Sequence, residues 1–246
     1  MLMKMNTGHP SFMQDEFRAG ITACLPTIPG YWSIGFAAGA IGTLSDFTPW
    51  QIALLATALY AGSAQFLFYS LWAAGAEMAS VVLSVLLVNL RYLLMSSAIS
   101  GFFRDYSTLQ KVVSGLLLTD ETFGVAVQRG GPQGKISFSW MLGLNVAAWL
   151  NWIIACVIGA GLATTLPASL MEGLGFSLVA MFIGLILMMW FASQRKALET
   201  LNIVTALAIT LFSAGSSSLS IVVIVAASVA ATLTTCLLRT RAQKGK

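Results

Sequence analysis

Charged side chains are scarce in this chain, and their scarcity excludes a soluble globular protein. They make up 9% of the 246 residues, against 57% hydrophobic residues, whereas a soluble domain carries about 25% charged residues. The chain also lacks the alternating segments that are typical of a membrane barrel. Backbone polar groups inside lipid must then find their partners within helices. We therefore predict an all-α integral membrane protein embedded in a lipid bilayer.

The residues of metal, redox and nucleophilic chemistry are also few. His9 is the single histidine. Cys24, Cys156 and Cys236 lie in apolar segments without the paired spacing of a disulfide framework or a metal site. Zinc-protease, phosphate-loop and nucleophile-elbow motifs are absent. The sequence thus predicts a protein that is not an enzyme and that binds no metal and no cofactor.

Positive charge is concentrated in short loops and at the C-terminus. The net charge is +4, and the last eight residues form a basic tail that contains Arg239, Arg241, Lys244 and Lys246. Such a tail is typical of cytoplasmic anchoring to anionic lipid, which we favour over nucleic-acid binding. Residues 1–16 lack the apolar core of a cleavable signal peptide. We expect a cytoplasmic arm (1–16), a polytopic transmembrane domain (17–238) and a cytoplasmic tail (239–246).

Seven to eight transmembrane segments are predicted, because eight apolar runs approach the length of about 20 residues that a span needs. They are roughly 17–44, 50–75, 79–101, 111–128, 138–164, 173–193, 201–213 and 217–238. With eight spans and a cytoplasmic N-terminus, most Lys and Arg residues lie inside, but Arg104 and Lys111 lie outside. The violation disappears if segments 50–75 and 111–128 both re-enter the membrane. We keep both topologies open.

Three of these runs carry helix interruptions, near residues 26–30, 61–65 and 119–121. In the first, Pro29 removes a backbone donor and disfavours helix at the preceding residue. A half-helix that begins at Pro29 and Gly30 would present free N–H groups to an anion such as a carboxylate. A simple proline kink is the alternative. In the second, Gly62 and Ser63 permit close helix approach, and the amide of Gln65 needs hydrogen-bond partners at that depth.

Charged and polar residues inside the apolar runs are the remaining candidates. Asp120 and Glu121 are functional candidates because intramembrane acids usually face a bundle interior or a water path; the alternative is a helix cap formed by Thr119 or Asp120. Asn89 and Arg91 lie about 200° apart on a regular helix, so both cannot face one site. Arg91 either pairs with one of the acids or contacts the substrate.

Small and aromatic residues suggest how the helices pack. Asn145, Trp149 and Trp152 follow i, i+4, i+7 spacing and form one stripe, which we assign to helix packing. Trp140 lies where an aromatic belt is expected. Small residues four apart, in the pairs Gly35 with Gly39 and Gly159 with Ala163, offer surfaces for close approach of another helix, either within this chain or from a partner subunit.

Taken together, these motifs resemble the AzlC family, the larger subunits of two-component exporters of branched-chain amino acids. The resemblance covers roughly residues 12–195. It rests on Phe17-Arg18-Ala19-Gly20, the interrupted first run, Tyr60-Ala61-Gly62-Ser63-Ala64-Gln65-Phe66, Asn89-Leu90-Arg91 and Leu118-Thr119-Asp120-Glu121-Thr122-Phe123. The order and spacing of these motifs are specific as a set.

The resemblance implies a transporter subunit of the bacterial inner membrane. It would export valine, leucine, isoleucine or similar hydrophobic amino acids with a small AzlD-type membrane subunit, driven by the proton gradient. The family commonly has His after the arginine where this chain has Tyr92, so the acidic pair becomes the candidate for proton coupling. An intramembrane enzyme subunit and a channel or scaffold are the alternatives to a transporter.

Overall fold

The computed structural model describes residues 10–165 and 196–212, together with positions 167, 176, 183–184, 186–187 and 190–191. Its described residues are helical and contain no strand. The chain divides into two compact units, residues 1–178 and 179–246. The predicted run 217–238 and tail 239–246, most of 173–193, and residues 1–9 of the predicted arm lie outside the described residues. The predicted run 201–213 corresponds to helix α11 (Lys196–Phe212) of the second unit.

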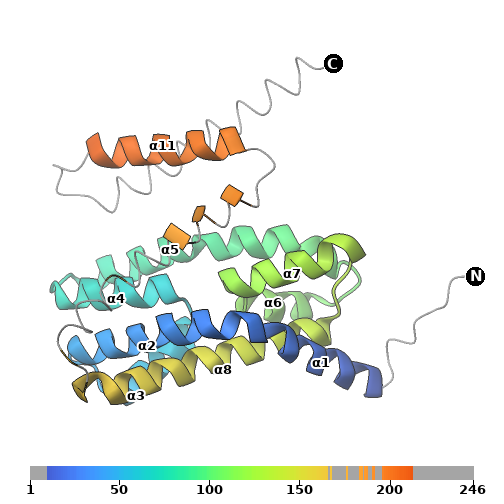
Figure 1. The fold of residues 1–246 in the computed structure, drawn as a ribbon, viewed down its shortest axis with the longest axis horizontal. Helices are drawn as coiled ribbons and strands as arrows, with labels where there is room; N and C mark the ends of the chain where they lie inside the picture. The colour runs from blue at the N-terminus through green and yellow to red at the C-terminus, as the bar shows by residue number, and fades with distance from the viewer. Residues whose placement is uncertain are drawn as a thin grey trace, which may run out of the picture. The chain divides into compact units, whose positions relative to one another are not determined.

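Three helices pack tightly along one another in the lower part of the first unit, as viewed in Figure 1. Helix α1 (Pro10–Cys24) continues through a short 3-10 stretch, η1 (Leu25–Thr27), into α2 (Ile28–Leu44), and both helices pack along α8 (Phe138–Leu162). The backbones touch because glycines line the seam. A Cβ added at Gly39 would lie 1.9 Å from the carbonyl oxygen of Cys156, and one at Gly143 would lie 2.1 Å from that of Phe17.

The glycine pairs noted in the sequence are therefore used inside the chain. A Cβ on Gly35 would lie 2.8 Å from the Cβ of Ala155, and one on Gly159 would lie 2.1 Å from the carbonyl oxygen of Phe36. The fourth residue, Ala163, is 4% exposed. Of the two alternatives for these surfaces, packing within this chain is the correct one, because α2 and α8 occupy each other's small-residue faces.

The predicted run 50–75 is a hairpin of two short helices. Helix α3 (Pro49–Leu59) begins at a capping box between Thr48 and Gln51, and α4 (Gly62–Ala73) follows after a sharp break. At the break, Tyr60 has a left-handed backbone with φ 39° and Ala61 is extended. The ring of Phe47, which precedes α3, lies 5.5 Å from that of Trp72 at the end of α4. The hairpin thus returns to the end of the bundle from which it started.

The predicted run 111–128 folds back in the same manner. Helix α5 (Met78–Ile99) and a 3-10 turn, η2 (Ser100–Phe103), lead into α6 (Thr108–Leu116) and then α7 (Asp120–Gln133). The end of α7 lies beside the segment before α6, since Ile136 N donates to Phe102 O at 3.3 Å and Lys135 pairs with Asp105. The two hairpins enter the bundle from opposite ends, because α5 runs between them.

The interruptions occur where the sequence indicates them, one or two residues early at two of the three sites. The chain breaks at residues 60–61 and 117–119, so Gly62–Gln65 and Asp120–Glu121 form first turns of helices. The interruption at 26–30 is milder, since Cys24, Thr27 and Ile28 all keep right-handed helical backbone around the 3-10 stretch. At about 1.5 Å per residue, the hairpin helices of 9 to 14 residues are about 14 to 21 Å long, too short to cross a bilayer core of about 30 Å.

Two described helices are long and apolar enough to cross a membrane by themselves, Met78–Phe103 and Phe138–Thr165.

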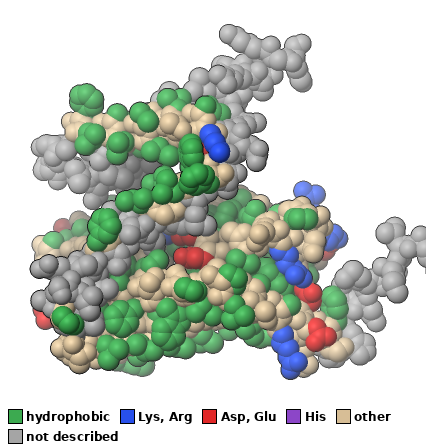
Figure 2. Space-filling view, viewed as in Figure 1, with side chains coloured by type: hydrophobic (Ala, Val, Ile, Leu, Met, Phe, Trp, Pro, Cys, Tyr) green, Lys and Arg blue, Asp and Glu red, His purple; other side chains and the backbone are tan. Residues whose placement is uncertain are grey.

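The two ends of the first unit differ in charge. Lys and Arg gather at the end where α7 finishes, visible at the right of Figure 2, and they include Arg104, Lys111, Arg129 and Lys135. The described loops at the opposite end carry Asp46 and Glu77 and no Lys or Arg.

Candidate functional site

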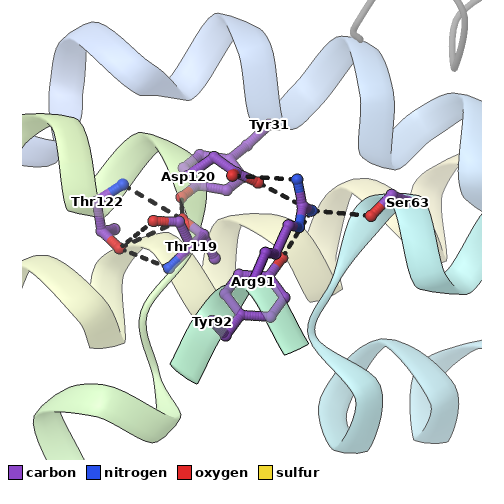
Figure 3. Close-up of polar contacts among 7 residues, drawn as sticks. All are labelled: Tyr31, Ser63, Arg91, Tyr92, Thr119, Asp120 and Thr122. Carbon is purple, nitrogen blue, oxygen red and sulfur yellow. Dashed lines mark hydrogen bonds and ion pairs between the residues drawn. The ribbon is translucent and has the colours of Figure 1, made fainter. Parts of the chain in front are cut away.

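The two hairpin breaks meet at Arg91, in the middle part of α5 (Figure 3). The guanidinium forms a two-pronged ion pair with Asp120, with Nη1 3.1 Å from Oδ1 and Nη2 2.9 Å from Oδ2. Nη2 also donates to Ser63 Oγ at 2.8 Å. Asp120 is the first residue of α7 and Ser63 the second of α4, so one arginine joins the N-terminal ends of both returning helices. The side chains of Arg91 and Asp120 are 27% and 19% exposed.

The start of α7 is fixed by a capping box. Thr119 Oγ1 accepts from Thr122 N at 3.3 Å, and Thr122 Oγ1 accepts from Thr119 N at 2.8 Å. The hydroxyl of Tyr31, in the first turns of α2, hydrogen-bonds Thr119 Oγ1. The helix cap that was the alternative interpretation of this segment is present at Thr119, and it holds both acids in the first turn of α7, where the helix dipole stabilises negative charge.

The adjacent residue, Tyr92, belongs to the same cluster. Its hydroxyl accepts a hydrogen bond from Arg91 Nη2 at 3.1 Å, and the guanidinium carbon lies 4.9 Å from the ring centre. The phenol of Tyr92, at the position where the family resemblance implies a histidine, therefore contacts the charged centre directly. Because a phenol is uncharged where a histidine would titrate near neutral pH, Tyr92 binds the arginine without supplying a proton carrier in the physiological range.

Glu121 differs from its neighbour in its surroundings. It is half-buried, and no cation in the described part of the chain forms an ion pair with it. The groups within electrostatic range of its carboxylate include Tyr31, Tyr60 and Cys24. The hydroxyl of Tyr60 is buried and has no hydrogen-bond partner among the described residues. Asp120 is thus neutralised by Arg91, whereas Glu121 faces uncharged polar groups.

Several residues predicted for the site lie elsewhere. Gln65 is fully buried and ties α4 to α8, since its Oε1 accepts from Trp152 Nε1 at 3.1 Å. Gly62 packs against the same indole, with an added Cβ 3.1 Å from the ring. Pro29 is exposed, and an added Cβ on Gly30 would meet nothing within 4 Å. Among the described residues, no hydrogen bond links Pro29 or Gly30 to Arg91.

Asn89 lies outside the Arg91 cluster. Its Oδ1 is buried and has no partner among the described residues. This placement agrees with the helix geometry, which turns residues 89 and 91 to different faces of α5.

The stripe on α8 holds both hairpins at their breaks. Asn145 Nδ2 donates to Ser114 O at 3.0 Å, in the last turn of α6, and Trp149 Nε1 donates to Thr57 O at 3.1 Å, in the last turn of α3. Trp152 completes the stripe through its bond to Gln65. These three donors hold the half-helices at fixed positions along α8. The positions of Ser63 and Asp120 relative to Arg91 are fixed as a result.

Sequence reasoning missed Tyr31 and Tyr60 and treated Tyr92 only as a departure from the family. Tyr31 and Tyr60 lie in interrupted runs, and Tyr92 lies in the continuous run 79–101. A tyrosine hydroxyl in an apolar segment needs a polar partner, which is the signal that would have included them.

Trp140 is also placed differently from its prediction: it is 2% exposed beneath the Arg129 guanidinium and not in an aromatic belt. Among the described residues, no three His, Cys, Asp or Glu side chains cluster as a metal site requires.

Comparisons with known proteins agree with the site motifs. The family model for AzlC protein matches residues 26–166. The chain is 31% identical to the inner membrane protein YgaZ of Escherichia coli, over 86% of this chain and 88% of that protein. It is 26% identical to a membrane protein of Archaeoglobus fulgidus, over 70% and 74% of the two chains. No solved structure matches. The helices that carry Tyr31, Ser63, Arg91 and Asp120 all lie inside the matched region, and the chain belongs to the AzlC family of membrane proteins.

Proposed function

We propose that this protein is the large subunit of an exporter of branched-chain or similar hydrophobic amino acids in the bacterial inner membrane. The observation that carries the proposal is the half-buried ion pair of Arg91 and Asp120, which lies where two broken helices meet inside an apolar bundle. Charges at membrane depth are costly and usually mark a transport pathway. Broken helices that present their N-terminal ends to a central site are typical of secondary transporters.

The chemistry of the cluster suits a zwitterion. Helix N-termini and a guanidinium attract a carboxylate, and the N-terminal ends of α4 and α7 both lie at Arg91. The Nε of Arg91 is buried and has no partner among the described residues, so the guanidinium retains a donor for a ligand. Glu121 supplies a negative charge for the ammonium group. An amino acid bound here would exchange with the Arg91–Asp120 pair, while its apolar side chain stays among apolar neighbours.

The orientation follows from the charges at the two ends of the first unit. We place the end that carries Arg104, Lys111 and Lys135 in the cytoplasm, since positive loops stay on that side. Both hairpins then re-enter the membrane, and the positive-inside violation of the eight-span topology does not arise. Because α5 separates the hairpins, one opens toward each side of the membrane and their breaks meet at mid-depth. The N-terminus lies in the cytoplasm in this topology.

Proton coupling falls to Glu121. It faces tyrosine hydroxyls and no cation in the described residues, so it can bind either a proton or an ammonium group without first breaking an ion pair. Binding of one then competes with binding of the other, which is the condition for exchange of protons against substrate. A small AzlD-type subunit completes the transporter in this proposal, as the family resemblance implies.

Efflux of leucine from loaded cells that lack other exporters tests the proposal. The complete system should export leucine, valine and isoleucine in competition with one another, and a protonophore should abolish efflux against the leucine gradient. Glu121→Gln should remove the response to the proton gradient. A matched control is Glu77→Gln, which removes an exposed carboxylate at the opposite end of the bundle. Efflux that follows the leucine gradient alone and ignores the protonophore would identify a channel and refute coupling.

A further inference from the structure

A polar cavity lies at the positively charged end of the first unit, away from the Arg91 site. Its volume is about 1010 Å³, and its walls come from α1, α7 and the segments before α6 and α8. Apolar side chains, among them Phe12, Met13 and Phe138, share the wall with four charged ones, Glu16, Arg129, Asp105 and Lys135. A concave site that combines apolar side chains with a few charged and polar groups is the usual form of a small-molecule site.

An ion pair lies in the wall of this cavity and joins α1 to α7. Arg129 Nη2 is 3.1 Å from Glu16 Oε2 and 3.2 Å from Oε1, and the two side chains are 31% and 19% exposed. The guanidinium also lies 4.7 Å from the ring centre of Trp140. Its Nε is buried and has no partner among the described residues. The pair thus offers one positive and one negative group to a ligand in the cavity.

The same two helices lead from this pair to the Arg91 site. Helix α1 runs inward from Glu16 to Cys24, and α7 runs outward from Glu121 to Arg129. Each stretch is eight residues, so Cys24 lies opposite Glu121 when Glu16 lies opposite Arg129, and Cys24 is within electrostatic range of Glu121. We call the interface between these stretches of α1 and α7 the α1–α7 seam. At 1.5 Å per residue, the seam is about 12 Å long from the Glu16–Arg129 pair to Glu121.

The packing indicates which side of the seam can move. Helix α1 is fixed to α8 by backbone contact, because an added Cβ on Gly20 would lie 2.0 Å from Trp140 O. Helix α7 has no comparable backbone contact with α8 at its glycines, since an added Cβ on Gly124 or Gly131 would meet nothing within 4 Å. At Gly130, helix α7 instead packs against a side chain, because an added Cβ would lie 2.6 Å from the Phe102 ring. The Glu16–Arg129 pair therefore ties a helix held by backbone contact to one held by side-chain contacts, which can rearrange.

We propose that this cavity is the loading site for a zwitterionic hydrophobic amino acid and that the Glu16–Arg129 pair is the gate between it and the Arg91 site. The inference rests on the proposed transport function for its ligand. The carboxylate of the ligand exchanges onto Arg129 and its ammonium onto Glu16, which separates α1 from α7 and opens the seam toward Glu121. The apolar wall holds the hydrophobic side chain during this exchange.

Thiol labelling tests the gate without measuring transport. Cys24 is fully buried at the inner end of the seam, and Cys156 is fully buried on α8, so the two thiols serve as reporter and control. In the full chain with Cys236→Ser, a membrane-impermeant maleimide is applied to inside-out vesicles and modification of each cysteine is quantified by mass spectrometry. Glu16→Gln and Arg129→Gln should each label Cys24 about tenfold faster, which corresponds to about 1.4 kcal/mol. Cys156 labelling should not change.

Two further variants separate opening of the gate from loss of folding. Lys111→Gln removes an exposed cation at the same end of the bundle but outside the cavity wall, and it should leave Cys24 labelling unchanged. The reversed pair, Glu16→Arg with Arg129→Glu, should return Cys24 labelling toward the slow rate. Unchanged labelling of Cys24 in both glutamine variants, or an equal rise at Cys156, would overturn the gate.

Ligand dependence is measured in the same assay. Added leucine should accelerate Cys24 labelling in the parent protein, whereas glutamate, which carries an extra negative charge, should not. If the glutamine variants open the seam but leucine has no effect, the loading site is refuted while the gate stands. A gate that opens with leucine in a protein that exports no amino acid would refute the transport proposal and leave this inference intact.

Discussion

Removal of Arg91 provides the sharpest test of the site, because one side chain holds α5, α4 and α7 together. Arg91→Ala leaves Asp120 without its counter-ion. Breaking a fully buried pair costs about 3–5 kcal/mol, but these side chains are 27% and 19% exposed, so solvent and the dipole of α7 recover part of that cost. We expect a loss of about 2 kcal/mol in the free energy of unfolding, with loss of leucine export.

The partner substitution separates stability from function. Asp120→Asn in the Arg91→Ala background removes the stranded charge and keeps the first turn of α7, so it should restore most of the lost stability and none of the export. Thermal unfolding in detergent and leucine efflux, measured for both single variants and the double variant, form a double-mutant cycle. If Arg91→Ala unfolds like the parent protein and the two effects simply add, the ion pair does not hold the site together and the reasoning is wrong.

The remaining predictions concern coupling, packing, topology and assembly. Glu121→Gln should insert normally but export without pH dependence, and export with the pH profile of the parent protein would exclude Glu121 as the proton carrier. Gly39→Leu should prevent stable folding because even a Cβ overlaps the α8 backbone, whereas Gly30→Ala, which meets nothing within 4 Å, should be stable; equal thermal stability of the two would contradict the backbone contact. Single cysteines at Arg104 and Lys135 should both label from the cytoplasmic side, and labelling from opposite sides would restore the eight-span topology. Expression without the neighbouring small membrane protein should give weak leucine efflux, and full efflux from this chain alone would refute the need for a partner.

Composition and local motifs were enough to determine the class of the protein and to name several residues of its candidate site. Scarce charge required membrane helices, because charged groups in lipid are costly and backbone groups need partners within their own segment. Thr119 marked a helix start, since a threonine hydroxyl in the cap position accepts from the backbone N–H three residues on. Arg91 and Asp120 were recognisable because charges at that depth need partners. The AzlC family followed from the order of these motifs.

Where the local sequence fits two structures equally well, only the tertiary structure decides between them. A single long helix and a hairpin of two half-length helices have the same apolar composition, so only the contacts of Phe47 with Trp72 and of Ile136 with Phe102 reveal that both runs fold back. Asp120 and Glu121 are adjacent and chemically alike, and only the position of α5 gives one of them to Arg91. Pairings between residues distant in the chain depend on helix placement, which no local pattern encodes.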